Sequence, residues 1–285
     1  MSTRAPQIAV VTGGASGLGA ALGGLFGREG MAVVVIDIDG SKAEAAASSL
    51  RATGIDALAI EADVAVPSSL DAAAATTAAR FGQCHVLCAN VSVVQLKSLD
   101  DTTLDDWRWI LDVNVIGTIA TVNAFLPLMR RSDGPRHVML TSSVSALRQT
   151  SHQGAYSASK AALTSYGETM RNELRGEGIG VSVLFPHGMM TNHLQSSTDV
   201  RPAHLGPSVE QSALDAVINE MATAVTETVS ADDAVRDLVP QLLDDAPYII
   251  THGLTARPAW RRRCAEVDAA FDRMEALRQY PRVRD

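Results

Sequence analysis

Short apolar runs alternate with longer stretches of helical periodicity along most of the chain. This alternation is typical of parallel strands that are joined by crossover helices and buried on both faces. The expected strands are Ile8–Thr12, Ala32–Asp37, Ala57–Glu61, His85–Ala89, His137–Thr141, Gly180–Phe185 and Tyr248–Thr251. The expected helices between them are Gly17–Glu29, Ser41–Ala52, Pro67–Phe81, Thr103–Arg130 and Ala155–Glu177. The pattern therefore predicts an α/β fold with a doubly wound parallel sheet.

The regularity stops after Pro186. Residues 191–207 contain two prolines, two histidines and many polar residues, which predicts a mobile loop that closes when substrate binds. Helical periodicity returns at Ser208–Thr228, Ala231–Leu243 and Pro258–Gln279. We interpret residues 1–285 as one domain, with 187–230 as substrate loop and helices and 252–285 as a C-terminal extension. We expect the extension to contact another subunit or to cover the substrate pocket.

Composition narrows the function class. A hydrophobic content of 46% supports a sizeable core, and a net charge of −8 argues against nucleic-acid or anionic-membrane partners. Cys84-His-Val-Leu-Cys88 lies in a strand-like run with no second ligand pair, so buried thiols are favoured over a metal site. The chain begins without a signal-peptide pattern and has no apolar run of 18 residues, so we expect a cytoplasmic protein.

A tyrosine and a lysine stand four residues apart in Tyr156-Ser-Ala-Ser-Lys160. Residues at this spacing share a helix face, so we expect the ammonium beside the phenol. A nearby cation favours the phenolate, whose unperturbed pKa is about 10, and makes the tyrosine a proton carrier. Ser143, thirteen residues upstream, offers a hydroxyl to hold the substrate oxygen. The adjacent Ser142 is expected to face the opposite way.

The segment Thr12-Gly-Gly-Ala-Ser-Gly-Leu-Gly19 follows one predicted strand and opens a helix. Its glycines let the backbone approach a pyrophosphate, and the helix N-terminus supplies N–H groups and a positive dipole end. A Walker loop is disfavoured because Ala20 and Ala21 replace its lysine and hydroxyl residue. Asp37 ends the second strand, where a carboxylate accepts the ribose hydroxyls and repels a 2′-phosphate. The sequence therefore predicts hydride transfer at a carbinol or carbonyl, with NAD as cofactor.

Taken together, these residues resemble the short-chain dehydrogenase/reductase family over almost the whole chain. The matching positions are Gly13, Gly17, Gly19, Asp37, Asp63, Val64, Asn90, Asn114, Ser143, Tyr156, Lys160, Pro186 and Thr191. The resemblance implies a Rossmann fold, an NAD-dependent alcohol dehydrogenase or ketone reductase (EC 1.1.1.-), and a homo-oligomer, tetramer or dimer. Two positions depart from the family pattern: Ala89-Asn-Val-Ser92 replaces Asn-Asn-Ala-Gly, and His187 replaces the glycine after Pro186.

The family's roles carry over to matching positions. Tyr156 is implied to be the general base in oxidation and acid in reduction, Lys160 lowers its pKa, and Ser143 polarises the substrate oxygen. Asn114 is implied to anchor a proton-relay water, and an asparagine inside a predicted helix is better explained by function than by propensity. The implied cofactor-binding residues are Gly13, Ser16, Gly17, Leu18, Gly19, Asp37, Ile38, Asp63, Val64, Asn90, Tyr156, Lys160, Pro186 and Thr191. For Asp63, a helix-capping role is the alternative.

We expect the substrate side to be formed by Ser143, Ser145, His152, His187 and Met190, with a purely structural role as the alternative for His187. Apolar residues nearby favour a medium or large hydrophobic secondary alcohol or ketone. The C-terminal third resembles dehydrogenases that oxidise benzylic alcohols of lignin-derived aryl ethers, with terpenoid and steroid-type dehydrogenases as competitors. Two other functions stay open: a carrier-protein-linked 3-oxoacyl reductase and a catalytically silent nucleotide-binding regulator. A hydrolase using Ser143 is disfavoured because no nucleophile elbow surrounds it.

Overall fold

The computed structural model describes residues 7–207, 209, 210, 212, 214 and 228–278. The strands are β1 (Ile8–Thr12), β2 (Ala32–Asp37), β3 (Ala57–Glu61), β4 (Val86–Ala89), β5 (Arg136–Thr141), β6 (Ile179–Phe185) and β7 (Tyr248–Ile250). The α-helices are α1 (Gly17–Arg28), α2 (Gly40–Ala52), α3 (Pro67–Phe81), α4 (Leu104–Leu111), α5 (Gly117–Arg131), α6 (Gly154–Leu174), α7 (His193–Asp199), α9 (Ala231–Val235), α10 (Leu238–Leu243) and α11 (Ala256–Arg278). The predicted strands and the first three predicted helices are confirmed with end shifts of one residue, and the helix predicted at 155–177 is confirmed as α6, which ends three residues earlier and continues as a 3-10 turn, Arg175–Glu177.

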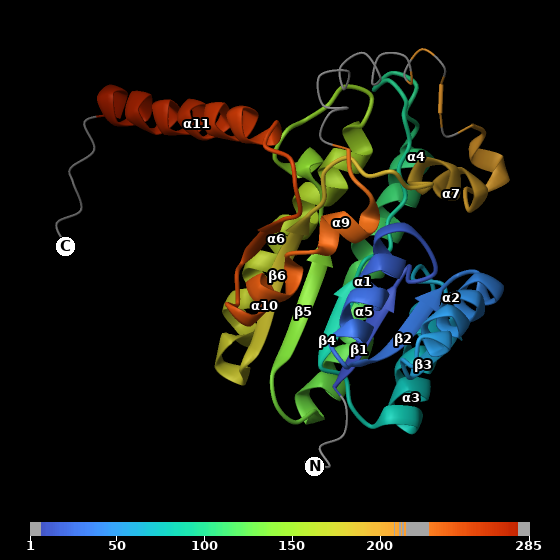
Figure 1. Cartoon of the computed structure of the whole chain (residues 1–285). Coiled ribbons are helices and arrows are strands. Elements are labelled where there is room, and N and C mark those ends of the chain that lie inside the picture. Colours follow the sequence, from blue (N-terminus) through green and yellow to red (C-terminus); the bar gives the residue numbers. More distant parts are fainter. Residues whose placement is uncertain (1–6, 208, 211, 213, 215–227, 279–285) are drawn as a thin grey trace.

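All strands form one parallel seven-stranded sheet in the order β3-β2-β1-β4-β5-β6-β7 (Figure 1). The chain runs outward from β1 to β3, then returns to β4 on the other side of β1. The direction of winding therefore reverses between β1 and β4. At such a point the loops after neighbouring strands diverge and leave a crevice at the carboxyl ends of the strands, where α/β proteins bind ligands. The predicted doubly wound sheet is confirmed.

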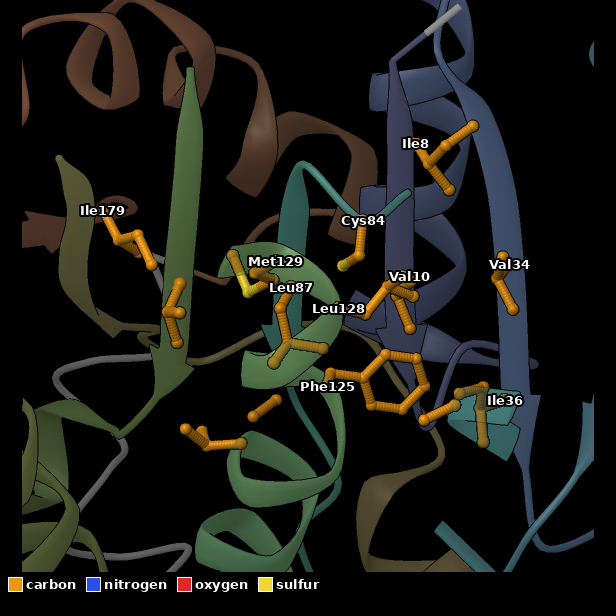
Figure 2. Close-up of a cluster of buried hydrophobic side chains, with 14 of the residues drawn as sticks. Ile8, Val10, Val34, Ile36, Cys84, Leu87, Phe125, Leu128, Met129 and Ile179 are labelled. Carbon is orange, nitrogen blue, oxygen red and sulfur yellow. The ribbon is translucent and has the colours of Figure 1, made fainter. Parts of the chain in front are cut away.

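Alternate residues of each strand face opposite sides of the sheet, so two cores form. On one side, strand residues such as Val10 and Leu87 pack against α3, α5 and α6, with Phe125 of α5 at the centre (Figure 2). On the other side, Val11 and Met139 pack against α1, α9 and α10. Because both faces are covered, β1, β4 and β5 are buried almost throughout.

The long helix predicted at 103–130 is interrupted. α4 and α5 are joined by a π-helical turn, η1 (Asp112–Ile116), in which one extra residue is accommodated. By length and composition, the stretch 104–131 is apolar enough to cross a membrane, but nearly half of its most apolar window is buried inside the protein. This is the pattern of a core helix.

Three expectations for the C-terminal third are corrected. Residues 191–207, expected to be irregular, contain α7 and the short η4 (Ala203–Leu205), and the helix expected at 231–243 is split into α9 and α10. α11 does not cover a pocket, because it projects away from the sheet after its first turns (Figure 1). Most of the helix predicted at 208–228 lies outside the described residues.

Candidate active site

The glycine turn forms a tight cradle between β1 and α1. Gly13 and Gly17 have φ of 62° and 52°, a backbone region that side chains disfavour. A Cβ on Gly19 would lie 2.0 Å from the Gly13 carbonyl oxygen, so only glycine fits there. Ser16 is the exposed N-cap of α1, and the Leu18 side chain joins the core, so Leu18 offers only its backbone. The cradle fits a pyrophosphate at a helix N-terminus.

Asp37 lies against this cradle at the end of β2. Its carboxylate accepts hydrogen bonds from Ala15 N (3.2 Å) and Asp39 N (3.2 Å). These bonds fix the negative charge beside the glycine turn, where a cofactor ribose would lie. Ile38, the next residue, is exposed at the same edge. The structure therefore brings together the residues expected to bind the adenosine half.

The ends of the neighbouring strands carry the remaining expected cofactor residues. Asp63 Oδ1 accepts from Ala65 N (2.8 Å) in the turn before α3, so the carboxylate shapes this turn and does not cap the helix, whose N-cap is Val66. Val64 is buried against Gly117. A Cβ on Gly117 would lie 2.7 Å from Val64 Cγ2, so the absence of a side chain at Gly117 makes room for Val64. The Asn90 amide binds the Thr12 carbonyl (3.2 Å) and accepts from Thr141 Oγ1 (3.2 Å), which ties β1, β4 and β5 together.

Ser142 and Ser143 follow β5 and face opposite ways, as predicted. Ser142 Oγ donates to the Lys160 carbonyl (2.8 Å), so it fastens the strand to α6. Ser143 is the N-cap of η2 (Val144–Ala146), and its Oγ accepts from Ser145 N (3.1 Å). The Ser143 hydroxyl lies beside the phenol of Tyr156.

Tyr156 and Lys160 occupy successive turns of α6, and both are buried. The lysine Nζ lies 5.6 Å from the centre of the tyrosine ring and donates to the Thr141 carbonyl (2.9 Å). The expected pairing of ammonium and phenol is therefore present. The hydrogen bond to Thr141, the last residue of β5, fixes the lysine ammonium at the end of the strand.

Burial dominates the proton affinities of this pair. It lowers the pKa of Lys160 from its ordinary value to about 7. Burial also raises the pKa of Tyr156, while the hydroxyls of Ser143 and Ser92 lower it. This differs from the expectation that lysine makes the phenol acidic, because in the protein chain alone desolvation outweighs the neighbouring groups. Any reactive proton carrier here depends on the hydroxyls around the phenol.

Asn114 sits in the π-helical turn and is fully buried. Its side chain accepts from Val93 N (2.7 Å) and donates to the Val93 carbonyl (2.9 Å) and to Ser159 Oγ (3.0 Å). The amide thus joins the loop after β4 to the helix that carries Tyr156. This clamp explains an asparagine inside a helix, and its implied role toward a relay water stays a prediction.

Two polar residues beside Tyr156 were missed by the sequence analysis. Ser92 Oγ is buried and has no hydrogen-bond partner of good geometry within the described part of the chain. His193, the first residue of α7, donates from Nε2 to the Ser92 carbonyl (3.1 Å), and its ring centre lies 6.2 Å from that of Tyr156. Burial and the Lys160 charge lower the pKa of His193 to about 4, so it is neutral. The departure from the family pattern at Ser92 was the available signal.

The predicted substrate residues divide into two groups. His152 has φ of 61°, a strained value for a non-glycine residue, and its buried Nδ1 lacks a hydrogen-bond partner among the described residues. Ser145 Oγ donates to Gln153 Oε1 (3.3 Å) next to it. In contrast, His187 binds Thr255 Oγ1 through Nε2 (2.8 Å), which favours the structural role, and the Met190 side chain is 70% exposed. Met190 therefore does not line a buried pocket in this structure.

The segment after β6 lies across the site. Pro186 accepts from Val144 N (3.1 Å), and Thr191 packs on Gly17 of the glycine turn. Ser197 Oγ of α7 accepts from Val94 N (3.0 Å). These contacts hold α7 over the loop after β4.

A buried ion cluster anchors the far end of this segment, and it could not be predicted from spacing because Arg201 lies 95 residues from Asp106 along the chain. Asp106 forms salt bridges with both Arg201 and Lys97, and the Lys97 Nζ lies 3.1 Å from Asp106 Oδ2. All three side chains are buried. The Arg201 guanidinium also lies 4.9 Å from the centre of the Trp109 ring. Burial raises the pKa of Asp106, but hydrogen bonds from Arg201, Thr103 and Lys97 outweigh it and hold the pKa below its ordinary value.

The fold and this site define a dinucleotide-dependent oxidoreductase with a tyrosine–lysine pair. The family profile described as short chain dehydrogenase matches residues 7–201. The chain belongs to the short-chain dehydrogenase family.

Three similar proteins illustrate the relationship. A "C alpha-dehydrogenase" from Sphingobium sp. strain NBRC 103272 / SYK-6 is 34% identical over 249 residues, covering 86% of this chain and 80% of that protein. A "1-deoxy-11-beta-hydroxypentalenate dehydrogenase" from Streptomyces exfoliatus is 35% identical over 205 residues, covering 71% and 74%. The crystal structure of a short chain dehydrogenase/reductase from Burkholderia phymatum in complex with NAD has a TM-score of 0.85 at 28% identity, covering 95% and 97%.

Proposed function

We propose that the protein is an NAD-dependent oxidoreductase acting on a medium or large hydrophobic secondary alcohol or the corresponding ketone. The observation that carries this proposal is the placement of Ser143, Tyr156 and Lys160 beside the glycine cradle, at the carboxyl ends of β1, β4 and β5. When bound, the nicotinamide supplies the hydride chemistry.

The residues on β1 and β2 would hold NAD in preference to NADP. The cradle formed by Gly13, Gly17 and Gly19 accommodates the pyrophosphate, and the backbone N–H groups that open α1 point toward it. Asp37 would accept hydrogen bonds from the adenosine ribose and repel a 2′-phosphate. Ser16 supplies no positive charge to offset that repulsion.

The chain's own residues manage the proton. In alcohol oxidation, the Tyr156 phenolate takes the proton of the substrate hydroxyl, and Ser143 holds the same oxygen. In ketone reduction, the tyrosine returns the proton to the oxygen, so the two directions use one group in opposite protonation states. Lys160 lies beside the phenol and, where it carries its proton, its charge would favour the phenolate, while burial lowers its own pKa.

We propose that Ser92 is a positioning residue that stabilises the phenolate. Its backbone is fixed by His193 on one side and by the Asn114 clamp on Val93 on the other. Its buried hydroxyl therefore faces Tyr156 with little freedom to turn elsewhere. A hydrogen bond to a charged group contributes about 1.5–3 kcal/mol, enough to move a pKa by about one unit or more.

Replacing Ser92 by alanine should shift the pH profile of alcohol oxidation. Oxidation requires the phenolate, so activity is lost as the pH falls through the pKa of Tyr156. Loss of the hydroxyl raises that pKa, and the acidic limb of kcat/KM should move up by about one pH unit. Ser145→Ala, which removes a hydroxyl bound to Gln153, is the control and should leave the limb in place. An unmoved limb in Ser92→Ala would remove Ser92 from the mechanism.

The substrate side favours a bulky alcohol that carries a second polar group. His152 Nδ1 is buried and has no hydrogen-bond partner among residues 7–207 and 228–278. Leaving such a group without a partner costs free energy, so a substrate oxygen or N–H is a fitting partner. The Streptomyces exfoliatus relative is named as the dehydrogenase of a hydroxylated compound, a hydroxypentalenate, which supports an alcohol as substrate. The alternative is a carrier-linked 3-oxoacyl reductase. Asp37 argues against it because its carboxylate would repel the 2′-phosphate of NADPH, and the net charge of −8 argues against it because an acidic carrier protein would be repelled.

A panel of secondary alcohols with NAD and NADP tests the proposal. Formation of reduced nicotinamide, followed by absorbance, should occur with NAD and with at least one aryl or terpenoid alcohol. Tight NAD binding without turnover of any alcohol or ketone would favour the silent regulatory protein.

We also propose that residues 191–207 close over the substrate. Hydrogen exchange should be faster there without ligand than with NAD and a slow inhibitor, because a bound ligand would stabilise the contacts that Thr191 makes with the glycine turn and α7 with the β4 loop. Arg201→Met breaks the ion cluster and should increase exchange in both states. Equal protection with and without ligands in the unmodified protein would show that the pocket is preformed.

The outer surface of α4, α5 and α6 supports a homo-oligomer, tetramer or dimer, only in part. Ile116, between α4 and α5, and Ala162 of α6 are exposed there, as an apolar subunit interface requires. However, α6 also exposes Glu168 and Thr169, so its outer face is more polar than the apolar face expected from the sequence. We place the enzyme in the cytoplasm, since its three cysteines are free thiols.

A further inference from the structure

α11 carries an apolar stripe that the described part of the chain does not cover. Figure 1 shows the helix projecting from the sheet. Its beginning contacts the described residues through buried Ala256 and through a hydrogen bond from Arg263 Nη1 to the Ala146 carbonyl (3.2 Å). From Ala265 to Leu277 every side chain except that of Ala269 is exposed. Such a helix has no tertiary packing to stabilise it, although isolated helices are marginal in water.

The apolar residues follow a coiled-coil spacing. The α11 stripe consists of Trp260, Cys264, Val267, Phe271 and Met274, separated by four, three, four and three residues. This alternation places all five on one seam of a helix. Trp260, Val267, Phe271 and Met274 are 42%, 48%, 60% and 43% exposed, which is more apolar surface than a helix in water normally shows.

Charges flank the stripe asymmetrically. The first half of α11 carries Arg257, Arg261, Arg262 and Arg263, and the second half carries Glu266, Asp268, Asp272 and Glu275, with Arg273 among them. A parallel partner of the same sequence would set the basic halves side by side. An antiparallel partner sets each basic half along an acidic half, and it also keeps the two folded bodies at opposite ends of a helix about 35 Å long.

We propose that α11 pairs with α11 of a second copy of this chain, antiparallel and through the α11 stripe. A two-fold axis at Val267 places Trp260 opposite Met274 of the second copy, and Cys264 opposite Ala270 of the second copy, next to its Phe271. The same arrangement sets Arg262 opposite Asp272 of the second copy. The surface is thus self-complementary, as a two-fold interface requires. A membrane surface is a poorer partner, because the acidic residues of the second half lie where such helices carry lysine or arginine.

Disulfide crosslinking tests both the pairing and its direction. In a Cys264→Ser background, Val267→Cys places a thiol on the axis, and Ala265→Cys places one about 200° away around the helix. With a mild oxidant at micromolar protein, Val267→Cys should form the dimer at least tenfold faster than Ala265→Cys. Adding Phe271→Asp to Val267→Cys should slow it at least tenfold. Cys84 and Cys88 are buried and do not compete.

Other results would overturn the proposal. Equal rates for Val267→Cys and Ala265→Cys would show that α11 is unpaired, and binding of the wild-type chain to anionic vesicles, lost in Phe271→Asp, would then assign the stripe to a membrane. Crosslinking of wild-type Cys264 as fast as Val267→Cys would show parallel pairing. Because the substituted side chains are exposed, thermal unfolding midpoints should match the wild type, which separates loss of pairing from loss of folding.

Discussion

Replacing Tyr156 by phenylalanine should lower kcat by about a thousandfold while leaving the NAD dissociation constant nearly unchanged. Only the phenolic oxygen is removed, and a positioned general acid or base contributes about 10²–10⁴-fold to a rate. The ring stays, so packing inside α6 and against His193 is kept. The measurement is steady-state turnover by reduced-nicotinamide absorbance, together with NAD binding by calorimetry.

Lys160→Ala provides the contrasting variant. The lysine is buried and bonded to the Thr141 carbonyl, so its loss should impair turnover and also disturb the strand end beside the cofactor. We therefore expect weaker NAD binding in this variant but not in Tyr156→Phe. A Tyr156→Phe enzyme that turns over at a near-normal rate would refute the catalytic assignment.

Cofactor choice should depend on Asp37. The wild-type enzyme should prefer NAD over NADP by about a hundredfold or more in kcat/KM, because a carboxylate beside a phosphate costs several kcal/mol and each 1.4 kcal/mol is tenfold. Asp37→Ala should narrow this ratio by at least about tenfold, mainly by improving NADP.

Asp39→Ala is the matched control for that experiment. Asp39 is the N-cap of α2 and accepts from Lys42 N, two residues beyond Asp37. Its loss removes a similar charge from the same edge but should leave the ratio close to that of the wild type. A wild-type enzyme that prefers NADP would show that Asp37 does not face the ribose.

The sheet was predictable because its central strands are buried on both faces and therefore read as short apolar runs, and because the partly exposed edge strands β3 and β7 are also apolar in sequence. β1, β2 and β3 begin and end where the runs do. Breaks inside helices were not predictable in the same way. The π-helical turn at 112–116 leaves the apolar periodicity of α4 and α5 almost unchanged, and the contact of its Asn114 with Val93 forms only in the folded chain.

The catalytic and glycine-turn residues were predictable because their chemistry needs fixed residue types at fixed spacings. Spacing did not reveal what lies around Tyr156. Ser92 and His193 are separated by about a hundred residues and meet only in the folded chain. Met190 was predicted to line the substrate site because it is apolar and follows the strand that ends there, but its side chain is exposed. Residue type alone does not tell which side of a loop faces a site.

Deuterium transfer tests the central claim most directly. A secondary alcohol that is a substrate, labelled with deuterium on its carbinol carbon, would be oxidised with NAD, and the reduced cofactor examined by proton NMR. Direct hydride transfer predicts one deuterium at nicotinamide C4, on a single face of the ring, for each ketone formed, and almost none with Tyr156→Phe in the same time. Ketone formation with no deuterium in the cofactor, or with the label on both faces, would contradict direct hydride transfer in this site.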